Sequence, residues 1–312
     1  MPLIYNIHLK HGIVLAPMSG YTDWPMRLLC RRYGAELAYT EMISAEGLVM
    51  STKNTLRLLK HPDEDRPLVA QIFTSSPMYG ALAAKIIEDQ GFEGIDINMG
   101  CPVRKVVKKG AGVALMRDPQ KALEIVESVI SKIRLPVSVK IRAGWDAGSI
   151  NAPEIAEMLC SSGINTIIVH PRTRTEMYRP GIRWELIGEI KKRVSIPVIA
   201  SGDIHSQSDV GRIKRLGAEG VMLGRATIGR PWIFMEIMGG NPPGPLEKRD
   251  VMLEHLDTLC TTYGERKGVL RMRKYISAYV KGLDGASAFR CKVNSILSAG
   301  QLRDHIHQFF NG

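Results

Sequence analysis

The chain has 312 residues, of which 45% are hydrophobic and 23% charged, and its formal net charge at pH 7 is +11. These values predict a sizeable soluble core, and the lack of any run of about 18 apolar residues argues against a membrane span. Five scattered cysteines form no Cys-x-x-Cys pair, which argues against zinc ribbons, metal clusters and redox dithiols.

The amino-terminal sequence and the charge indicate a location and a partner. The first residues, MPLIYNIHLKHG, lack the charged start and long apolar centre of a signal peptide, so we expect a cytoplasmic location. The chain carries 42 basic and 31 acidic residues, and such an excess is typical of proteins with a polyanionic partner, often nucleic acid. Colloidal solubility explains the same charge about as well.

Short β-rich segments recur along the chain, with helix-like segments between them. They span residues 13–18, 37–42, 68–73, 94–99, 137–142, 166–170, 197–201 and 221–224. Their nearly continuous apolar character is typical of parallel strands that are buried on both faces. Eight β/α units in about 240 residues predict an α/β fold of the (β/α)8 TIM-barrel type. A doubly wound sheet is the competing fold, but it rarely has eight such evenly spaced units.

The connecting helices carry start signals, and the barrel has a predicted end. For one helix, Asp118 is the expected N-cap and Pro119 the expected first residue. Its apolar face is expected at Leu123, Val126, Ile130 and Ile133. The segment GGNPPGP (239–245) cannot continue a helix and is expected to link residues 1–240 to residues 246–312. Residues 246–312 lack strand-like alternation and predict a small all-helical carboxy-terminal domain.

This carboxy-terminal segment is the more basic part per residue, with 11 basic and 7 acidic side chains between 246 and 312. Arg271, Lys274 and Lys281 are spaced by three and seven residues, which puts them on one face of an expected helix. Tyr275 and Tyr279 lie beside that face. Interleaved cations and aromatic rings suit the backbone and bases of RNA. An ordinary solvated helix face is the simpler explanation of this spacing alone.

Active sites of TIM barrels form at the ends of the strands, so polar side chains there are candidates. They are Gln71, Asn98, Cys101, Lys140, Arg142 and His170. Lys140 should point inward and then needs an anionic partner, which a reduced flavin ring would provide. Gln71 and Asn98 suit hydrogen bonds to the edges of a ring.

The last two predicted strands both close on glycine. Backbone N–H groups at Gly202 and Gly224 can approach an anion, usually a phosphate in this fold, and Arg225 adds a guanidinium. Alternatively, the glycines merely permit tight turns. One phosphate and one polar ring fit FMN. The first strand is followed by no Gly-x-Gly-x-x-Gly motif, which disfavours a stably bound dinucleotide.

The segment GIDINMGCPVRKVVKKGAG (94–112) places a thiol beside a group of cations. Cys101 follows a predicted buried strand, and Arg104, Lys105, Lys108 and Lys109 come next in a loop flanked by glycines. A packed cysteine, a solvated loop and a metal ligand are three simple interpretations.

These segments resemble the tRNA-dihydrouridine synthases, and in particular bacterial members. The resemblance rests on APMSGYTD (16–23), YTEM (39–42), INMGCPVRKVVKKGAG (97–112), VSVKIRAGWD (137–146), VHPRTR (169–174), ASGDI (200–204), MLGRATIGRPWIF (222–234) and RKYISAYVKGLDGASAFR (273–290). It covers nearly the whole chain. It implies reduction of the C5=C6 bond of particular uridines in the D-loop of tRNA, with FMN as cofactor and NADPH as its transient reductant.

The resemblance also implies roles for individual residues. Cys101 matches the proton donor, which would protonate C5 of uracil after hydride transfer from N5 of FMN to C6. The matches to the flavin site are Pro17, Met18, Ser19, Gln71, Lys140, His170, Ser201, Gly202, Asp203, Gly224 and Arg225. We expect substrate contacts from Asn98, Arg104, Lys105, Lys108, Lys109, Arg271, Lys274 and Lys281. Ser201 stands where the family usually has asparagine, and Pro171 where it usually has glycine.

The resemblance implies an FMN-binding catalytic barrel over residues 1–240, a tRNA-binding domain over residues 246–312, and a monomeric protein. Three rival interpretations are an FMN barrel that acts on a free pyrimidine, a non-enzymatic RNA-binding barrel, and an aldolase-like barrel with Lys140 as a Schiff base. The first of them leaves the basic loop and the basic tail unexplained.

Overall fold

A computed structural model describes residues 2–311 of the chain. Contacts within the chain divide it into two units, which are described separately below. Unit 1 comprises residues 1–23 and 35–224, and unit 2 comprises residues 24–34 and 225–312. Within the described residues, no helix combines the length and apolar character that crossing a bilayer requires.

Unit 1 contains a closed barrel of parallel strands. Within residues 2–311 its strands are β3 (Ile13–Leu15), β4 (Leu37–Tyr39), β6 (Leu68–Phe73), β7 (Gly94–Met99), β8 (Val137–Gly144), β9 (Thr166–Thr173), β10 (Val198–Ser201) and β11 (Gly220–Leu223). Neighbouring strands pair in chain order, and β11 pairs with β3 to close the ring. A short strand, β5 (Ile43–Ser44), adds to β6. The predicted TIM-barrel fold is therefore confirmed.

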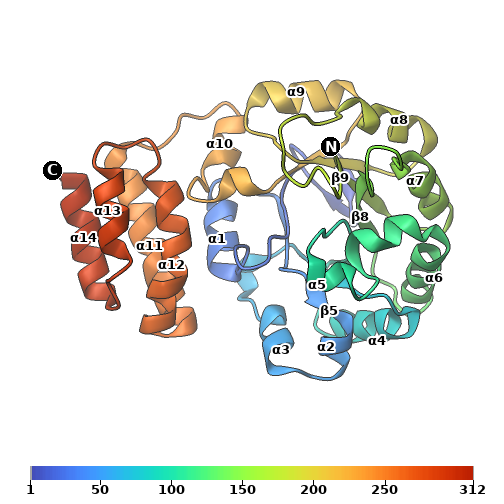
Figure 1. Cartoon of the computed structure of the whole chain (residues 1–312), viewed down its shortest axis with the longest axis horizontal. Helices are drawn as coiled ribbons and strands as arrows, with labels where there is room; N and C mark the ends of the chain where they lie inside the picture. The colour runs from blue at the N-terminus through green and yellow to red at the C-terminus, as the bar shows by residue number, and fades with distance from the viewer. Residues whose placement is uncertain (1, 312) are drawn as a thin grey trace. The chain divides into compact units, whose positions relative to one another are not determined.

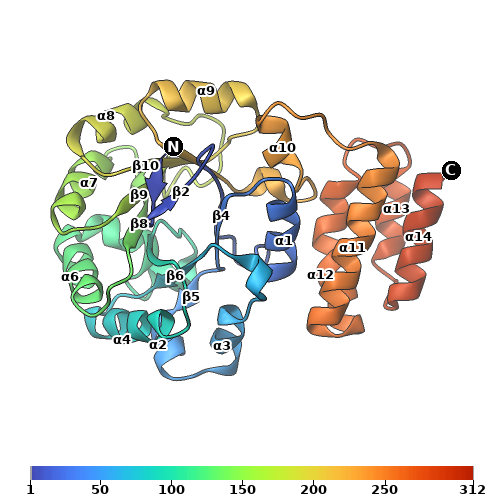
Figure 2. The same cartoon turned by 180° about the vertical axis from the view of Figure 1, so that it is seen from behind.

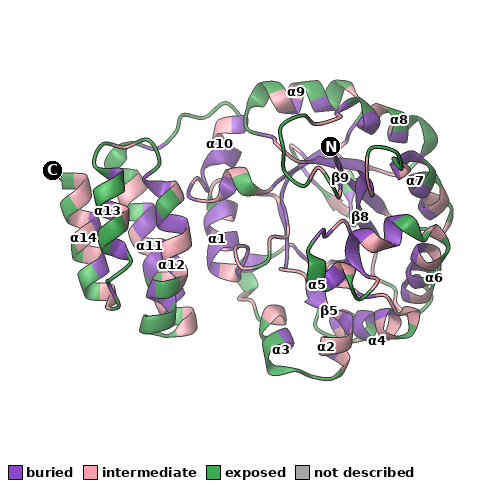
Figure 3. Ribbon diagram, viewed as in Figure 1, coloured by how far each residue is buried: buried purple, intermediate pink, exposed green. Residues whose placement is uncertain are grey.

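Helices surround these strands (Figure 1). In unit 1 they are α2 (Ala45–Val49), α3 (Lys53–Leu59), α4 (Pro77–Glu88), α5 (Arg104–Val107), α6 (Pro119–Ile130), α7 (Ala152–Ser161), α8 (Glu185–Arg193) and α9 (Gln207–Arg215). Two 3-10 segments, η1 (Asp63–Asp65) and η2 (Gly112–Arg117), complete the unit. Figure 3 shows the strands buried and the outer helix faces exposed, as expected for a parallel barrel.

The start of α6 is as predicted, whereas its buried face is not. The side chain of Asp118 accepts a hydrogen bond from the N–H of Lys121, and Pro119 occupies the first turn. The buried side chains are Ala122, Ile125, Val126 and Val129. Of the predicted stripe only Val126 belongs to this face. Leu123 and Ile130 are half-buried, and Ile133 lies beyond the helix, which ends at Ile130.

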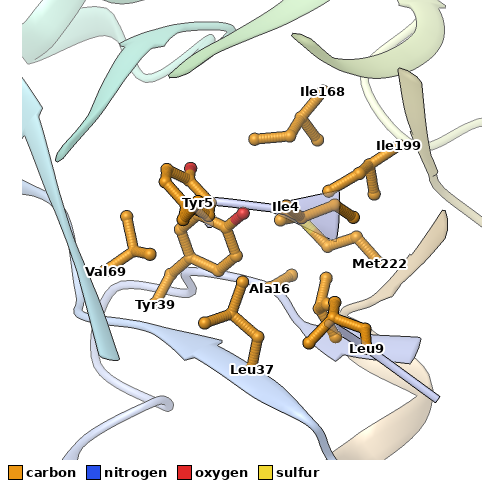
Figure 4. Close-up of a cluster of buried hydrophobic side chains, with 11 residues drawn as sticks. Ile4, Tyr5, Leu9, Ala16, Leu37, Tyr39, Val69, Ile168, Ile199 and Met222 are labelled. Atoms are coloured by element: carbon orange, nitrogen blue, oxygen red, sulfur yellow. The ribbon is translucent and has the colours of Figure 1, made fainter. Parts of the chain in front are cut away.

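An amino-terminal hairpin fills the barrel at the end where the strands begin. It consists of β1 (Leu3–Ile4) and β2 (Ile7–His8), joined by Tyr5 and Asn6, which have positive φ angles of 52° and 62°. Ile4 and Tyr5 join the interior cluster drawn in Figure 4. A Cβ on Gly94 would lie 2.4 Å from Cδ1 of Tyr5, so β7 needs glycine where the ring enters.

Side chains on alternate strand positions line the barrel interior, which has an apolar half and a polar half. The strands β3, β4, β10 and β11 contribute Val14, Leu37, Ile199 and Met222 to the apolar cluster. The strands β6, β7 and β8 contribute Gln71, Asp96, Asn98, Ser138 and Lys140, which neighbour one another in the strand register. Polar groups inside a barrel lower stability unless they are paired, so this half is the place to look for function.

Unit 2 is helical. It comprises α1 (Trp24–Arg32), η3 (Arg225–Thr227), α10 (Ile233–Ile237), α11 (Pro245–Tyr263), α12 (Glu265–Tyr279), α13 (Ala286–Val293) and α14 (Ala299–Asn311). The helices α11 and α12 lie side by side (Figure 2) around a buried histidine, His255. Burial lowers the pKa of His255 to about 3, so the ring is neutral, and its Nδ1 lies 3.2 Å from the hydroxyl of Tyr279. The predicted all-helical tail is confirmed.

Candidate active site

The strand ends bring several predicted residues together on the inward side of the barrel. Asn98 and Lys140 are register partners on β7 and β8, and Arg142 and His170 are register partners on β8 and β9. Gln71, on β6, accepts a hydrogen bond from Nδ2 of Asn98 at 2.9 Å. These side chains lie in the middle or toward the carboxyl ends of their strands, and barrel enzymes bind their ligands at the carboxyl ends.

Cys101 is held by the side chain of Asn98. The Oδ1 atom of Asn98 accepts the N–H of Gly100 at 3.1 Å and the N–H of Cys101 at 2.9 Å. The carbonyl of Cys101 accepts the N–H of Val113 at 3.1 Å. Gly112, with a φ of +63°, lies so close that a Cβ there would be 2.8 Å from that carbonyl oxygen. The cysteine therefore lies in a loop whose backbone is fixed on both sides.

Cys101 is 9% exposed and packs with Val106 and Ala111. Burial raises the pKa of the thiol, and the guanidinium of Arg142 opposes part of this rise. Arg142 also donates from Nε to the carbonyl of Gly100 at 2.8 Å. The protonated thiol is therefore the form that the site favours at neutral pH.

The basic loop after Cys101 forms α5 and the turn that follows it. Arg104, Lys105, Lys108 and Lys109 are all exposed. They are not among the groups that shift the pKa of Cys101. The four cations are thus available to a polyanion.

Lys140 is a half-buried lysine beside a buried carboxylate. Burial lowers the pKa of Lys140 to about 8, while the nearby Asp96 acts in the opposite direction. Among residues 2–311, no side chain makes a hydrogen bond or ion pair to the ammonium of Lys140. An inward ammonium without such a partner is complementary to an anionic ring, and the residues present therefore fit a reduced flavin.

His170 lies against the strand end that follows it in the barrel. A Cβ on Gly202 would lie 2.6 Å from Nε2 of His170, so the imidazole occupies the space that a side chain would need. Arg172 is fully buried and forms an ion pair with Asp203. The sequence did not single out Arg172, although its two-residue spacing from His170 on the same strand was a usable signal.

The loop after β3 holds the first three predicted flavin contacts, Pro17, Met18 and Ser19. It folds back on itself, because the N–H of Met18 donates to Oγ1 of Thr22 at 2.8 Å and the N–H of Thr22 donates to the carbonyl of Met18 at 3.0 Å. The N–H of Gly20 donates to Glu41, which ties the loop to the segment after β4.

The end of β11 lies beside this loop. A Cβ on Gly224 would lie 3.7 Å from Sδ of Met18. Ser201 ends β10 as the register partner of Met222 on β11, so the predicted phosphate residues of unit 1 lie on or directly after adjacent strands. Arg225 follows Gly224 directly in the chain and opens η3, which belongs to unit 2.

In unit 2, the three cations predicted to contact RNA differ in their neighbours and in their position relative to α12. The guanidinium of Arg271 lies 4.0 Å from the ring centre of Tyr263, and the ammonium of Lys274 lies 4.8 Å from that of Tyr275. Lys281 is exposed but lies beyond α12, which ends at Tyr279, so it does not share a helical face with the other two.

The tyrosines of the tail are part of its core. Tyr275 and Tyr279 are both buried, and their rings lie 4.4 and 6.0 Å from that of His255. The expectation that these two rings stack on RNA bases is wrong, because the helical core needs their apolar area.

The comparisons with known proteins agree with the sequence motifs. Residues 14–311 match the family model described as dihydrouridine synthase (Dus). The chain is 41% identical to tRNA-dihydrouridine synthase B of Pseudomonas aeruginosa, over 97% of this chain and 93% of the relative. It is 40% identical to the enzyme of the same name from Vibrio cholerae, over 99% and 98% of the two chains. A probable tRNA-dihydrouridine synthase of Rickettsia prowazekii is 38% identical, over 98% and 97%.

Solved structures share the barrel at much lower sequence identity. A morphinone reductase mutant in complex with tetrahydroNAD has a TM-score of 0.57 and 12% identity, and the match covers 78% of this chain and 90% of that one. TcOYE with pHBA has a TM-score of 0.58 and 12% identity, with 79% and 94% covered. At this identity the likeness establishes the fold alone.

Proposed function

Because the chain belongs to the dihydrouridine synthase family, we propose that it reduces the C5=C6 bond of specific uridines in the D-loop of tRNA, with FMN as bound cofactor and NADPH as transient reductant. The observation that carries this proposal is Cys101. Its thiol is nearly buried at a strand end of the barrel, and its pKa is raised, as a proton donor requires. Transfer RNA is a cytoplasmic molecule, so the proposed site of action is the cytoplasm, and the proposed active form is a monomer.

The proposed roles in the barrel follow from charge and hydrogen-bonding capacity. Bound FMN supplies the hydride for C6 of uracil. Lys140 offers an ammonium to the negative charge of the reduced ring, and Gln71 and Asn98 offer amide groups to ring edges. The Sγ atom of Cys101 donates the proton to C5, and Asn98 holds the backbone of the cysteine for that step.

The remaining predicted flavin contacts fall into three groups. Ser201, Gly202, Asp203, Gly224 and Arg225 are proposed at the phosphate, and Pro17, Met18 and Ser19 along the ring. His170 is proposed beside the flavin. Asp203 is already paired with Arg172, so its carboxylate is balanced before a phosphate arrives.

The proposed binding of tRNA depends on exposed cations. A uracil within folded RNA must leave its stack to reach a barrel mouth, which costs a few kcal/mol. Contacts of phosphates with Arg104, Lys105, Lys108 and Lys109 would offset this cost. Arg271, Lys274 and Lys281 are proposed to add contacts from the helical tail.

The test is dihydrouridine formation on defined RNA. Purified protein is incubated with unmodified tRNA, FMN and NADPH, and dihydrouridine is mapped by mass spectrometry. We expect product with the wild type, none with Cys101→Ala, and wild-type levels with Cys160→Ala, whose thiol lies on α7 away from the strand ends. Cys101→Ala should still bind FMN and accept electrons from NADPH. Product formation by Cys101→Ala at the wild-type rate would refute the proposed proton donor.

The same preparation tests the rival interpretations. Protein without flavin absorption would favour a non-enzymatic RNA-binding barrel. Turnover of free uracil at a rate similar to that of tRNA would favour a pyrimidine reductase. Trapping of Lys140 by borohydride with a carbonyl substrate would favour an aldolase-like reaction.

A further inference from the structure

Asp96 lies at the centre of the polar half of the barrel and has no role in the proposal above. It is 0% exposed on β7, two residues before Asn98 on the same side of the strand. Its Oδ1 atom accepts a hydrogen bond from the hydroxyl of Ser138, and its Oδ2 atom accepts one from Nε2 of Gln71 at 2.7 Å. Both oxygens therefore act as acceptors.

A one-way chain of hydrogen bonds runs from Asp96 to Cys101. Because Gln71 donates to Asp96 from Nε2, its Oε1 faces the other way and accepts Nδ2 of Asn98 at 2.9 Å. Because Asn98 donates from Nδ2, its Oδ1 faces the backbone, where it accepts the N–H groups of Gly100 and Cys101. Reversal of either amide would place donors opposite donors, and the loop of Cys101 would lose its anchor.

Asp96, the acceptor at the start of this series of hydrogen bonds, decides which way round the two amides lie. A glutamine or asparagine amide carries a donor at one end and an acceptor at the other, so by itself it can lie either way round. A carboxylate cannot donate, so it admits only one orientation of Gln71. Burial raises the pKa of Asp96 to about 7, and the hydrogen bonds from Ser138 and Gln71 and the charge of Lys140 act against the rise. A solution at pH 8 is above this pKa, so the carboxylate form prevails there.

We propose that Asp96 is a positioning residue, which fixes the direction of the Gln71 and Asn98 amides and thereby anchors the loop that carries Cys101. The inference deepens the proposed function and rests on it, because the anchored group is the proton donor of that reaction. Ser138 is the matched comparison: it also donates to Asp96, but it lies outside the path from Asp96 to Cys101.

The experiment measures how readily the thiol is reached in the isolated full-length protein at pH 8. Iodoacetamide alkylates cysteines, and the rate at Cys101 is compared by mass spectrometry with that at Cys291, an exposed cysteine in the same molecule. We expect Asp96→Leu to raise the Cys101 rate by about tenfold. This is the change that the loss of the two hydrogen bonds from Gly100 and Cys101 to Asn98 makes to a local opening equilibrium. Asp96→Asn puts at residue 96 an amide that can lie either way round, so its Cys101 rate should lie between those of the wild type and of Asp96→Leu.

Two further variants keep the test decisive. Ser138→Ala should leave the Cys101 rate near the wild-type value, because the chain toward Cys101 stays whole. Gln71→Met interrupts the chain without touching Asp96 and should match Asp96→Leu, which keeps the proposal testable if Asp96→Leu fails to fold. The proposal is overturned if Gln71→Met leaves the rate unchanged, or if Ser138→Ala raises it as much as Asp96→Leu does. It is also overturned if Asp96→Asn leaves the rate at the wild-type value.

The alkylation assay tests the role of Asp96 separately from the proposed function, since it needs neither tRNA nor NADPH. A wild type that forms no dihydrouridine would refute the proposed function whatever the alkylation rates are. Dihydrouridine formation by the wild type, together with equal Cys101 rates in all variants, would refute the role of Asp96 and leave the proposed function standing.

Discussion

Gly202 and His170 occupy complementary space at the ends of β10 and β9. A Cβ on Gly202 would lie 2.4 Å from Cδ2 and 2.6 Å from Nε2 of the imidazole. The φ angle of Gly202 is +108°, so the backbone conformation also favours glycine. The position of His170 therefore depends on the absence of a side chain at residue 202.

This contact predicts the effect of Gly202→Ala on the cofactor. The added methyl group must displace the imidazole, and we expect the Kd for FMN to rise by about tenfold or more, measured by fluorescence titration of apoprotein. Gly163→Ala is the matched control, because Gly163 has a φ of +92° but no atom within 4 Å of the added Cβ. Equal loss of FMN affinity in both variants would mean that backbone strain, and not His170, is responsible.

The protonation of Cys101 predicts a pH dependence. The proposed active form is the neutral thiol, which exists below its pKa and disappears as the pH rises through it. Burial raises that pKa, so the rate of dihydrouridine formation should hold through neutral pH and fall only in the alkaline range. The measurement is a single turnover with pre-reduced enzyme and tRNA. Cys101→Ser should be slower and lack the alkaline decline, and an unchanged decline in that variant would assign it to another group.

The exposed cations after Cys101 predict a change in salt dependence. Replacement of Lys108 and Lys109 by glutamine should weaken tRNA binding and reduce the slope of log K against log salt by about 0.7–0.9 per cation removed. Filter binding over a range of salt concentrations measures this slope. The control variant carries Lys132→Gln and Lys192→Gln, two exposed lysines at the carboxyl ends of barrel helices. Equal slopes for the two double variants would show that the loop does not contact phosphates.

The amino-terminal hairpin predicts a loss of stability in Gly94→Ala. The added Cβ would lie 2.4 Å from Cδ1 and 2.8 Å from Cε1 of Tyr5, inside a packed barrel. We expect the free energy of unfolding in urea to fall by about 1–3 kcal/mol. Gly148→Ala should change it little, since its nearest neighbour is 3.6 Å away. The double variant with Tyr5→Ala should lose less than the sum of the single variants, and strict additivity would contradict the proposed collision.

The barrel and the inward residues of its strand ends were predictable because both follow from local pattern. Parallel strands have a side-chain period of two, and the carboxyl ends of barrel strands converge, so Gln71, Asn98, Lys140 and His170 had to lie near one another. Asp96 was missed although it has the same parity as Asn98. It lies between Ile95 and Ile97, and the alternation of the segment was interpreted as apolar burial alone.

The features that escaped prediction depend on contacts between distant segments. The hairpin of β1 and β2 turns at Tyr5 and Asn6 without glycine, so its signal lies in the barrel that receives it. The buried face of α6 is set by the strands and helices beneath it, and the predicted stripe missed Ala122 and Ile125. The burial of Tyr275 and Tyr279 follows from the packing of α11 on α12, which a spacing rule for one helix cannot foresee.

The hairpin also fixes an order of events during synthesis. Ile4 packs in the same cluster as Met222, so the hairpin, which is made before the barrel strands, shares its neighbours with β11, the last strand of the barrel to be made. Until β11 is made, the barrel that covers the apolar side chains of the hairpin is incomplete. A nascent chain that stops before residue 220 therefore leaves part of this apolar surface exposed. A deletion that removes Ile4 and Tyr5 would leave this cluster incomplete and expose apolar surface at the end of the barrel where the strands begin.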